Sequence, residues 1–136
     1  MAAVAAVGRP PEADALPDEG SLRADLLAVV DSPWLGGPER RLVVLAGLVA
    51  AGRGSAPLAH AVRVTVTEPY VQVYAALLDR AVDRGELEPA VRPRVPLLAQ
   101  VVPAMAGHRL GAAGEPAGRA YFVAVVDEVL LPALRA

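Results

Sequence analysis

The sequence contains no cysteine, lysine, asparagine or isoleucine, and aromatic residues make up only 4% of its 136 positions. The absence of cysteine excludes disulfide bonds and thiolate-ligated metal sites. Because lysine is absent, all thirteen basic residues are arginine. Lysine, asparagine and isoleucine share AT-rich codons, so their joint absence indicates a GC-rich genome and carries no functional information.

The chain also lacks a long apolar segment. Residues 2–7 are apolar, but they span only about two helical turns and follow no basic residue, whereas a secretory signal peptide needs a longer apolar stretch and positive charge. No apolar run approaches the roughly 18 residues of a membrane-spanning helix. We therefore expect a soluble, cytoplasmic protein without a membrane partner.

Hydrophobic residues make up 54% of the sequence and charged residues 21%, a balance typical of a globular protein. A chain of 136 residues is long enough to bury a core and favours a single domain. The net charge of −2 gives no electrostatic reason for this chain to bind nucleic acid itself.

Apolar residues recur with helical spacing along most of the chain, and this pattern predicts an all-α bundle of about five or six helices. Ser21 and Ser55 are placed to cap helices, Pro69 to begin or kink a long helix, and Gly85 to end it. Residues 1–20 are expected to form the tail of a linker helix and a proline-rich loop. The predicted helices cover residues 21–30, 38–51, 69–84, 93–110 and 116–135, with a turn at 111–114.

Residues 62–67 carry an ambiguous pattern. Val62, Val64 and Val66 alternate with polar residues, which is typical of a β-strand. Because the sequence predicts no second strand to pair with this one, we expect the segment to be helical, with tertiary packing overriding the local preference.

Two segments near the C-terminus are apolar on most of their surface. Residues 97–106, within a helix expected to bend at Pro103, contain Gln100 as their only polar side chain, and residues 121–131 contain only two acids. Helices that are apolar all round are buried from two sides, and in so small a domain one side is expected to be another subunit. Both could instead be central core helices. The predicted homodimer interface consists of Leu98, Val101, Val102, Tyr121, Phe122, Val125 and Val129.

No arrangement of residues in the sequence indicates catalysis or metal binding. His60 and His108 lie far apart and in no metal-binding pattern, and no nucleophile elbow surrounds any serine. Asp127 and Glu128 are expected to mark the solvated edge of an apolar helix and not an acid/base pair. We therefore expect no enzymatic activity, no metal and no cofactor.

A ligand pocket has more support, because such pockets are mostly apolar with a few polar and aromatic groups. Tyr70 and Tyr74 are one helical turn apart and share a face. Gln100, if buried, would need a partner that a ligand or a dimer contact could supply. Each of these residues could also be an ordinary core residue. The candidate ligand-binding residues are Trp34, Tyr70, Gln72, Tyr74, Gln100, Met105 and His108.

Three segments, in their order along residues 21–136, resemble the C-terminal domain of TetR-family transcriptional regulators. They are the run from Ser21 to Leu27, the pair Glu68-Pro69 followed by an amphipathic run to Arg84-Gly85-Glu86-Leu87, and the turn Gly114-Glu115-Pro116. The resemblance implies that residues 21–136 form a ligand-binding and dimerisation domain. It also implies two partners, a second copy of the chain and a small hydrophobic effector.

In the TetR family, effector binding changes the spacing of two N-terminal helix-turn-helix heads and so controls DNA binding. Residues 1–20 are too few for such a head, and residues 2–7 resemble the end of the helix that links head to body. We therefore expect a fragment, or a mis-called start, of a longer repressor that contacts DNA only through a helix-turn-helix absent from this chain. A natural headless protein is the alternative, as is a free-standing helical dimerisation or interaction protein without DNA binding.

Overall fold

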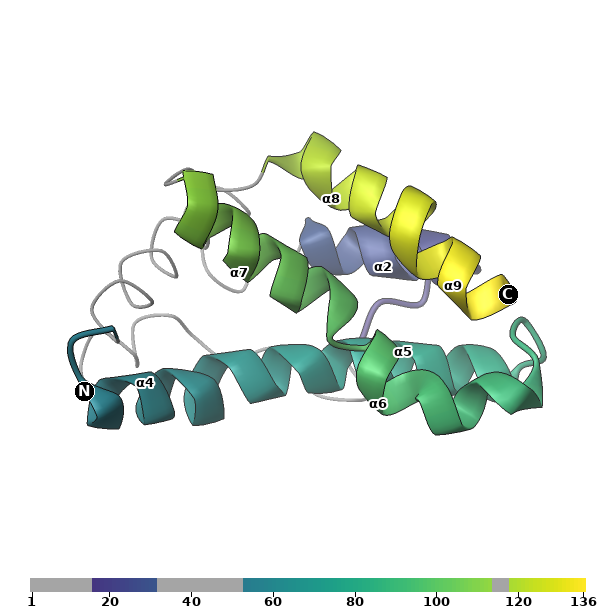
Figure 1. Cartoon of the computed structure of the whole chain (residues 1–136). Helices are drawn as coiled ribbons and strands as arrows, with labels where there is room; N and C mark the ends of the chain where they lie inside the picture. The colour runs from purple at the N-terminus through teal and green to yellow at the C-terminus, as the bar shows by residue number, and fades with distance from the viewer. Residues whose placement is uncertain (1–15, 32–52, 114–117) are drawn as a thin grey trace.

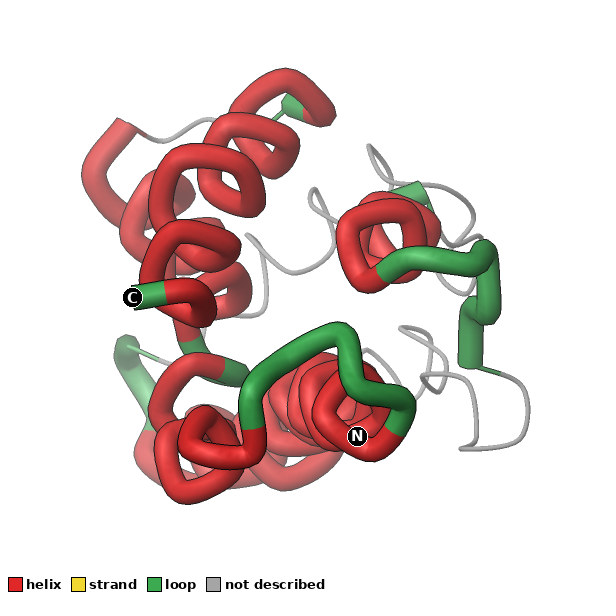
Figure 2. Tube along the Cα trace, turned by 90° about the vertical axis from the view of Figure 1, so that its right-hand side faces the viewer, coloured by secondary structure: helices red, strands yellow, loops and turns green. Residues whose placement is uncertain are grey.

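The computed structural model describes residues 16–31, 53–113 and 118–136. Within these ranges every regular element is a helix and none is a strand, so the predicted all-α class is confirmed (Figure 2). The helix expected over residues 38–51 and the linker-helix tail at residues 2–7 lie outside the described residues. No helix in the described ranges is both long and apolar enough to cross a bilayer.

Helix α2 (Leu22–Val30) begins where the sequence predicts. The Ser21 hydroxyl oxygen accepts a hydrogen bond from the Ala24 amide at 3.2 Å, which satisfies one of the amide groups left unpaired at a helix start. Leu22, Leu26 and Val29 follow at helical spacing and are buried. The helix therefore turns one apolar stripe toward the rest of the bundle.

The longest helical run joins α4 (Ala56–Val62), the π-helix η3 (Arg63–Thr67) and α5 (Glu68–Asp83). The alternating valines thus lie in a helix, as expected, although the helix is widened there. Pro69 accounts for the widening, because its ring clashes with the carbonyl four residues earlier and it has no amide hydrogen to donate. A second π-helix, η5 (Val126–Leu130), likewise ends two residues before a proline, Pro132.

Helix α5 ends at a glycine, as the sequence predicts. Gly85 has a φ of +81°, and the amides of Gly85 and Glu86 donate to the carbonyl oxygens of Val82 and Ala81 at 3.1 and 2.9 Å. This pair of bonds is a Schellman motif, which closes a helix at a residue in the left-handed conformation. The chain then reverses direction and runs back along α5.

The return path differs from the prediction of one helix bent at Pro103. It comprises the 3₁₀-helix η4 (Pro89–Arg94), the short α6 (Val95–Leu98), a two-residue turn and α7 (Val101–Ala113). The break precedes Pro103 because the proline ring excludes the carbonyl four residues earlier, that of Ala99, from a continuous helix. Helix α7 also continues through residues 111–113, where the sequence predicted a turn.

The last run comprises α8 (Arg119–Val125), η5 and α9 (Leu131–Arg135), and it ends where the sequence predicts. Figure 1 shows α7 and the α8–α9 run on one side of the long α4–α5 helix, and α6 beside α5. Helix α2 packs on both α5 and α8–η5. The core lies between these helices, and its largest fully buried side chains include Tyr74, Leu77, Leu26, Phe122 and Leu130.

Candidate functional site

A groove of about 550 Å³ lies between α5 and the η4–α6 return path. Helix α5 forms one wall, and the 3₁₀-helix and α6 form the other because the Gly85 turn folds them back along α5. Most of the lining is apolar or small, with two amide side chains and one ion pair among it. The lining residues are Val71, Gln72, Ala75, Asp79, Arg92, Val95, Pro96, Ala99 and Gln100.

The two glutamines that the sequence analysis selected, Gln72 and Gln100, both line this groove. Both are exposed, one on each wall. The Gln100 amide nitrogen donates to the Pro96 carbonyl oxygen at 3.1 Å, one helical turn earlier, which leaves its amide oxygen as an acceptor. The groove therefore offers amide hydrogen-bonding groups beside an apolar floor.

An ion pair forms part of the groove lining. The Arg92 guanidinium lies 3.2 Å from Asp79 and 2.5 Å from Asp83, both on α5. Because these three side chains remain about half exposed or more, the pairs contribute little to stability, but they tie η4 to α5. The spacing of the two groove walls therefore depends partly on this arginine.

The two tyrosines lie elsewhere, in the core. Tyr70 and Tyr74 are buried, their rings meet edge to face with centroids 5.2 Å apart, and their hydroxyl oxygens are 3.2 Å apart. They share a face of α5, as predicted, but that face is opposite to the one bearing Gln72. The structure therefore does not bring the tyrosines and the glutamines together in one pocket.

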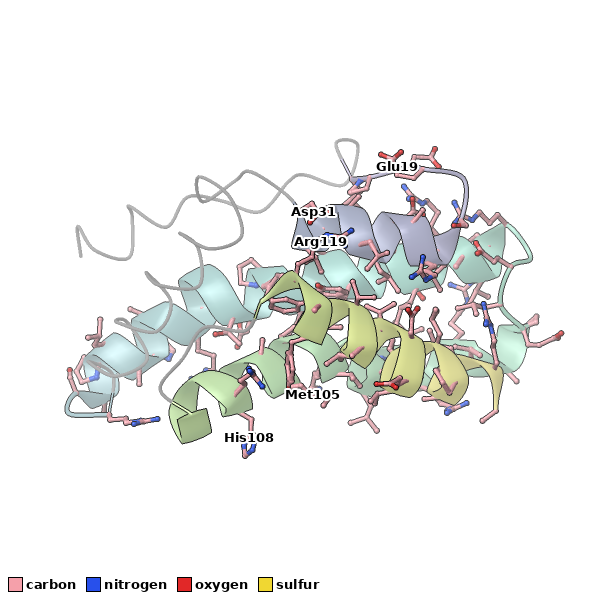
Figure 3. All side chains as sticks on the ribbon, turned by 90° about the horizontal axis from the view of Figure 1, so that it is seen from above. Glu19, Asp31, Met105, His108 and Arg119 are labelled. Atoms are coloured by element: carbon pink, nitrogen blue, oxygen red, sulfur yellow. The ribbon has the colours of Figure 1, made fainter. Side chains whose placement is uncertain are left out.

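The remaining candidates do not line the groove either. Met105 is half-buried on α7, and its carbonyl oxygen accepts a hydrogen bond from the Tyr121 hydroxyl at 3.3 Å. His108 is exposed and points away from the bundle (Figure 3). Trp34 lies outside the described residues. Across the described ranges, no group of three or more acids or histidines is placed to hold a metal ion.

The comparison with protein families gives one match, to the family described as tetracyclin repressor-like, C-terminal domain, over residues 16–129. The chain belongs to this family. No curated protein and no solved structure shows a significant match. The matched residues include both groove walls, α8 and all of η5 but its last residue, so this TetR-like domain accounts for the described fold up to the start of α9.

Two of the predicted interface residues in the TetR-like domain are half-buried, Val101 and Tyr121, and Val129 has 39% of its surface exposed. The neighbouring Leu97, which the sequence analysis did not select, is 69% exposed. The chain's own helices bury the remaining four, which are Leu98, Val102, Phe122 and Val125. Among the predicted interface residues, any surface that α7 and α8–α9 offer to a second copy is therefore formed by Val101, Tyr121 and Val129 and not by these four.

A buried ionic cluster was not predicted from the sequence. Asp25 on α2 has only 1% of its surface exposed and pairs with Arg80 at 3.0 Å, in the last turn of α5, and with Arg84 at 3.1 Å, the residue that caps this helix. Its other carboxylate oxygen accepts the Glu19 amide at 2.6 Å. A buried charge is tolerated only when paired in this way. Its position three residues after Leu22, on the apolar face of α2, was the available signal.

The same cluster ties the Gly85 turn to the start of α2. Glu86 accepts the Leu22 amide at 2.7 Å and pairs with Arg84 at 2.7 Å. The hydrogen bond to Glu86 is the main cause that raises the pKa of Arg84 above its usual value. Arg80 also donates to the carbonyl of Pro17. Residues 17–22 are thus held against the exit of α5 by charged groups.

Surface ion pairs connect α2 to the last helical run. Arg23 contacts Asp127 at 2.8 Å, and this hydrogen bond is the main cause that lowers the pKa of Asp127 below its usual value. Arg119 contacts Asp31 at 3.0 Å, as Figure 3 shows at the start of α8. Asp127 and Glu128 were predicted to lie together at the solvated edge of the last helix. Asp127 is instead turned toward α2, where it pairs with Arg23.

Proposed function

We propose that this chain is the effector-binding and dimerisation domain of a TetR-like transcriptional repressor that acts in the cytoplasm. The match of residues 16–129 to the tetracyclin repressor-like C-terminal domain carries the proposal. The domain controls DNA binding by a helix-turn-helix that these 136 residues do not include. It acts by binding and conformational change, and no catalytic step is part of the proposal.

The effector proposed for the groove is a small, largely apolar molecule with a polar group that pairs with Gln72 or Gln100. The volume of about 550 Å³ lies within the range of ligand pockets, and the lining combines apolar walls with a few polar groups, as ligand sites do. Because one wall is α6, which a two-residue turn joins to α7, a ligand that spreads the walls favours a different position of α7. The effector thus acts by population shift.

A thermal-shift screen with a panel of hydrophobic compounds tests effector binding. Compounds that bind the native chain raise its unfolding temperature, and the rise grows with the logarithm of the ratio of ligand concentration to Kd. Ala75→Phe places a larger side chain in the groove and is expected to abolish the shift. Ala59→Phe, at an exposed position on α4 away from the groove lining, is the matched control and should leave the shift intact.

Equal shifts in both variants would place the effector somewhere other than the groove. No shift with any compound would favour the alternative function, a helical dimerisation protein without a ligand.

In a gel-shift assay, the chain alone is expected to leave operator-containing DNA unbound, because its net charge of −2 does not attract the DNA phosphates.

The proposed partner is a second copy of the chain, contacted through the surface where α7 lies beside α8 and η5. Val101, Tyr121 and Val129 give that surface exposed or half-exposed apolar groups. Contiguous exposed apolar side chains are characteristic of interaction surfaces. A two-fold dimer would bury the same surface on both copies.

A further inference from the structure

The groove between α5 and the η4–α6 return path is polar at both ends and apolar between them. Val71, Ala75 and Asp79 follow one another at four-residue intervals, so they form a single strip along α5. The strip spans about 12 Å, at a rise of about 1.5 Å per residue. Because the return path runs back along α5, Arg92 lies at the Asp79 end and Gln100 lies toward the other end (Figure 1). A ligand lying along the groove therefore meets an ion pair at one end and an amide at the other.

The ion pair at the Asp79 end carries an excess of negative charge. Arg92 donates through one terminal nitrogen to Asp79 at 3.2 Å and through the other to Asp83 at 2.5 Å, so two carboxylates surround a single guanidinium. Only the Oδ1 atom of Asp79 accepts from Arg92, and no residue in the described ranges donates to the other carboxylate oxygen. The Asp79 side chain is 45% exposed. It can therefore accept a hydrogen bond from a ligand while it keeps its contact with Arg92.

This arrangement favours a cation over an anion at the Asp79 end of the groove. An anion placed beside Arg92 would also lie next to Asp79 and Asp83, and both carboxylates would repel it. The two terminal nitrogens of the guanidinium already donate to those carboxylates, which leaves the arginine with fewer donors for an incoming acceptor. A cation, by contrast, is attracted by the excess negative charge and has a free oxygen to bind.

The lining also distinguishes between two kinds of organic cation. A protonated amine has N–H groups that can donate to the free oxygen of Asp79 in a charge-assisted hydrogen bond. A quaternary ammonium has no N–H group, and proteins recognise it mainly through the faces of aromatic rings. Among the described residues that line the groove, none is aromatic. The groove therefore fits an amine and not a quaternary ammonium.

We infer that the effector of this groove carries a protonated primary or secondary amine, which donates to Asp79 while its apolar body lies along Val71, Ala75 and Val95. The inference names the chemical class of the ligand and rests on the effector-binding function proposed above. The polar group proposed to pair with Gln72 or Gln100 belongs to the opposite end of the same molecule. Because Asp79 is half exposed, the ammonium adds selectivity for the ligand class, and the apolar strip supplies most of the buried area.

Isothermal titration calorimetry of the full chain with four octyl compounds tests the amine. Octylamine, octanol, octanoate and octyltrimethylammonium share one apolar chain and differ only in their head groups. Octylamine should bind on the order of fivefold more tightly than octanol, and the carboxylate and the quaternary ammonium should bind no more tightly than octanol. The preference for octylamine should shrink at high salt, because salt screens a half-exposed ion pair.

Two neighbouring acids provide the matched variants. Asp79→Asn and Asp83→Asn each remove one negative charge and one partner of Arg92, but only Asp79 lines the groove. Asp79→Asn should bring the affinities for octylamine and octanol together, whereas Asp83→Asn should keep most of the preference for octylamine. Circular dichroism checks that both variants remain folded. An equal loss of preference in the two variants would overturn the contact with Asp79, because a general charge effect does not depend on which acid is removed.

Failure of the amine and failure of the effector-binding function give different results. Octanol or octanoate that binds as tightly as octylamine, with all binding lost in Ala75→Phe, would overturn the amine and leave the groove as the effector site. Octylamine that does not bind, while neutral compounds of the thermal-shift panel do, would have the same meaning. No binding of any octyl compound together with no thermal shift from the panel would overturn both proposals.

Discussion

A single buried carboxylate holds the start of this domain against the end of α5. Asp25 is buried among the core helices, and its two arginines come from a helix far away in the sequence. Removing one member of a buried charge group costs more than the group contributes in total, because the remaining charges lose their partners. The cluster therefore acts as a structural tie between residues 17–25 and the end of α5.

Asp25→Ala leaves Arg80 and Arg84 facing an empty space and is expected to lower the free energy of unfolding by roughly 2–3 kcal/mol. This lies below the range for fully buried pairs, because both arginines keep about a third of their surface in solvent. Urea denaturation measures the change. Asp127→Ala, which removes a surface pair with Arg23, is the control, and an equal loss in both variants would contradict the special role of burial.

The sequence does not predict whether a given side chain points into the core or toward solvent. Spacing alone showed that Tyr70 and Tyr74 share a face, and they do, but it could not show that this face is the core. Gln100 was selected because a buried glutamine needs a partner, whereas the break before α7 leaves it exposed at the groove. Burial depends on the neighbouring elements, which no local pattern specifies.

At the scale of elements, the helix ends were the most predictable features. Ser21, Ser55 and Gly85 mark ends through hydrogen bonds that involve only nearby residues, so their signals are local. The break at residues 99–100 was not foreseen. Pro103 was assigned a bend at its own position, but its ring acts on the turn before it. The same displacement explains why both π-helices precede their prolines.

Two glycines, one at a helix end and one inside a helix, allow a matched test of how α5 ends. Gly85→Ala is expected to lower the free energy of unfolding by about 1–2 kcal/mol, because a φ of +81° is unfavourable for alanine although the space around it is open. Gly107→Ala, in the interior of α7 with equally open surroundings, is expected to raise it by about 0.5–1 kcal/mol. Urea denaturation of both variants would contradict this account if the two changes had the same sign.

At the scale of the whole molecule, hydrophobic periodicity was sufficient to predict an all-α bundle, and the order of its segments was sufficient to indicate the family. The sequence did not show which apolar residues of the last helices lie in the core and which lie at the surface. Phe122 and Val125 are as apolar as Tyr121 and Val129, yet the chain buries the first two and exposes part of the others. Only the packing of α7, α8 and α2 separates the two sets.

The most direct test of the proposed role is the mass of the wild-type chain in solution. Sedimentation equilibrium at tens of micromolar should give twice the 14.0 kDa of one chain, because a second copy buries the partly exposed apolar side chains of Val101, Tyr121 and Val129. The dimer should dissociate on dilution with a single Kd. A mass of 14.0 kDa over the whole concentration range would contradict the dimerisation role.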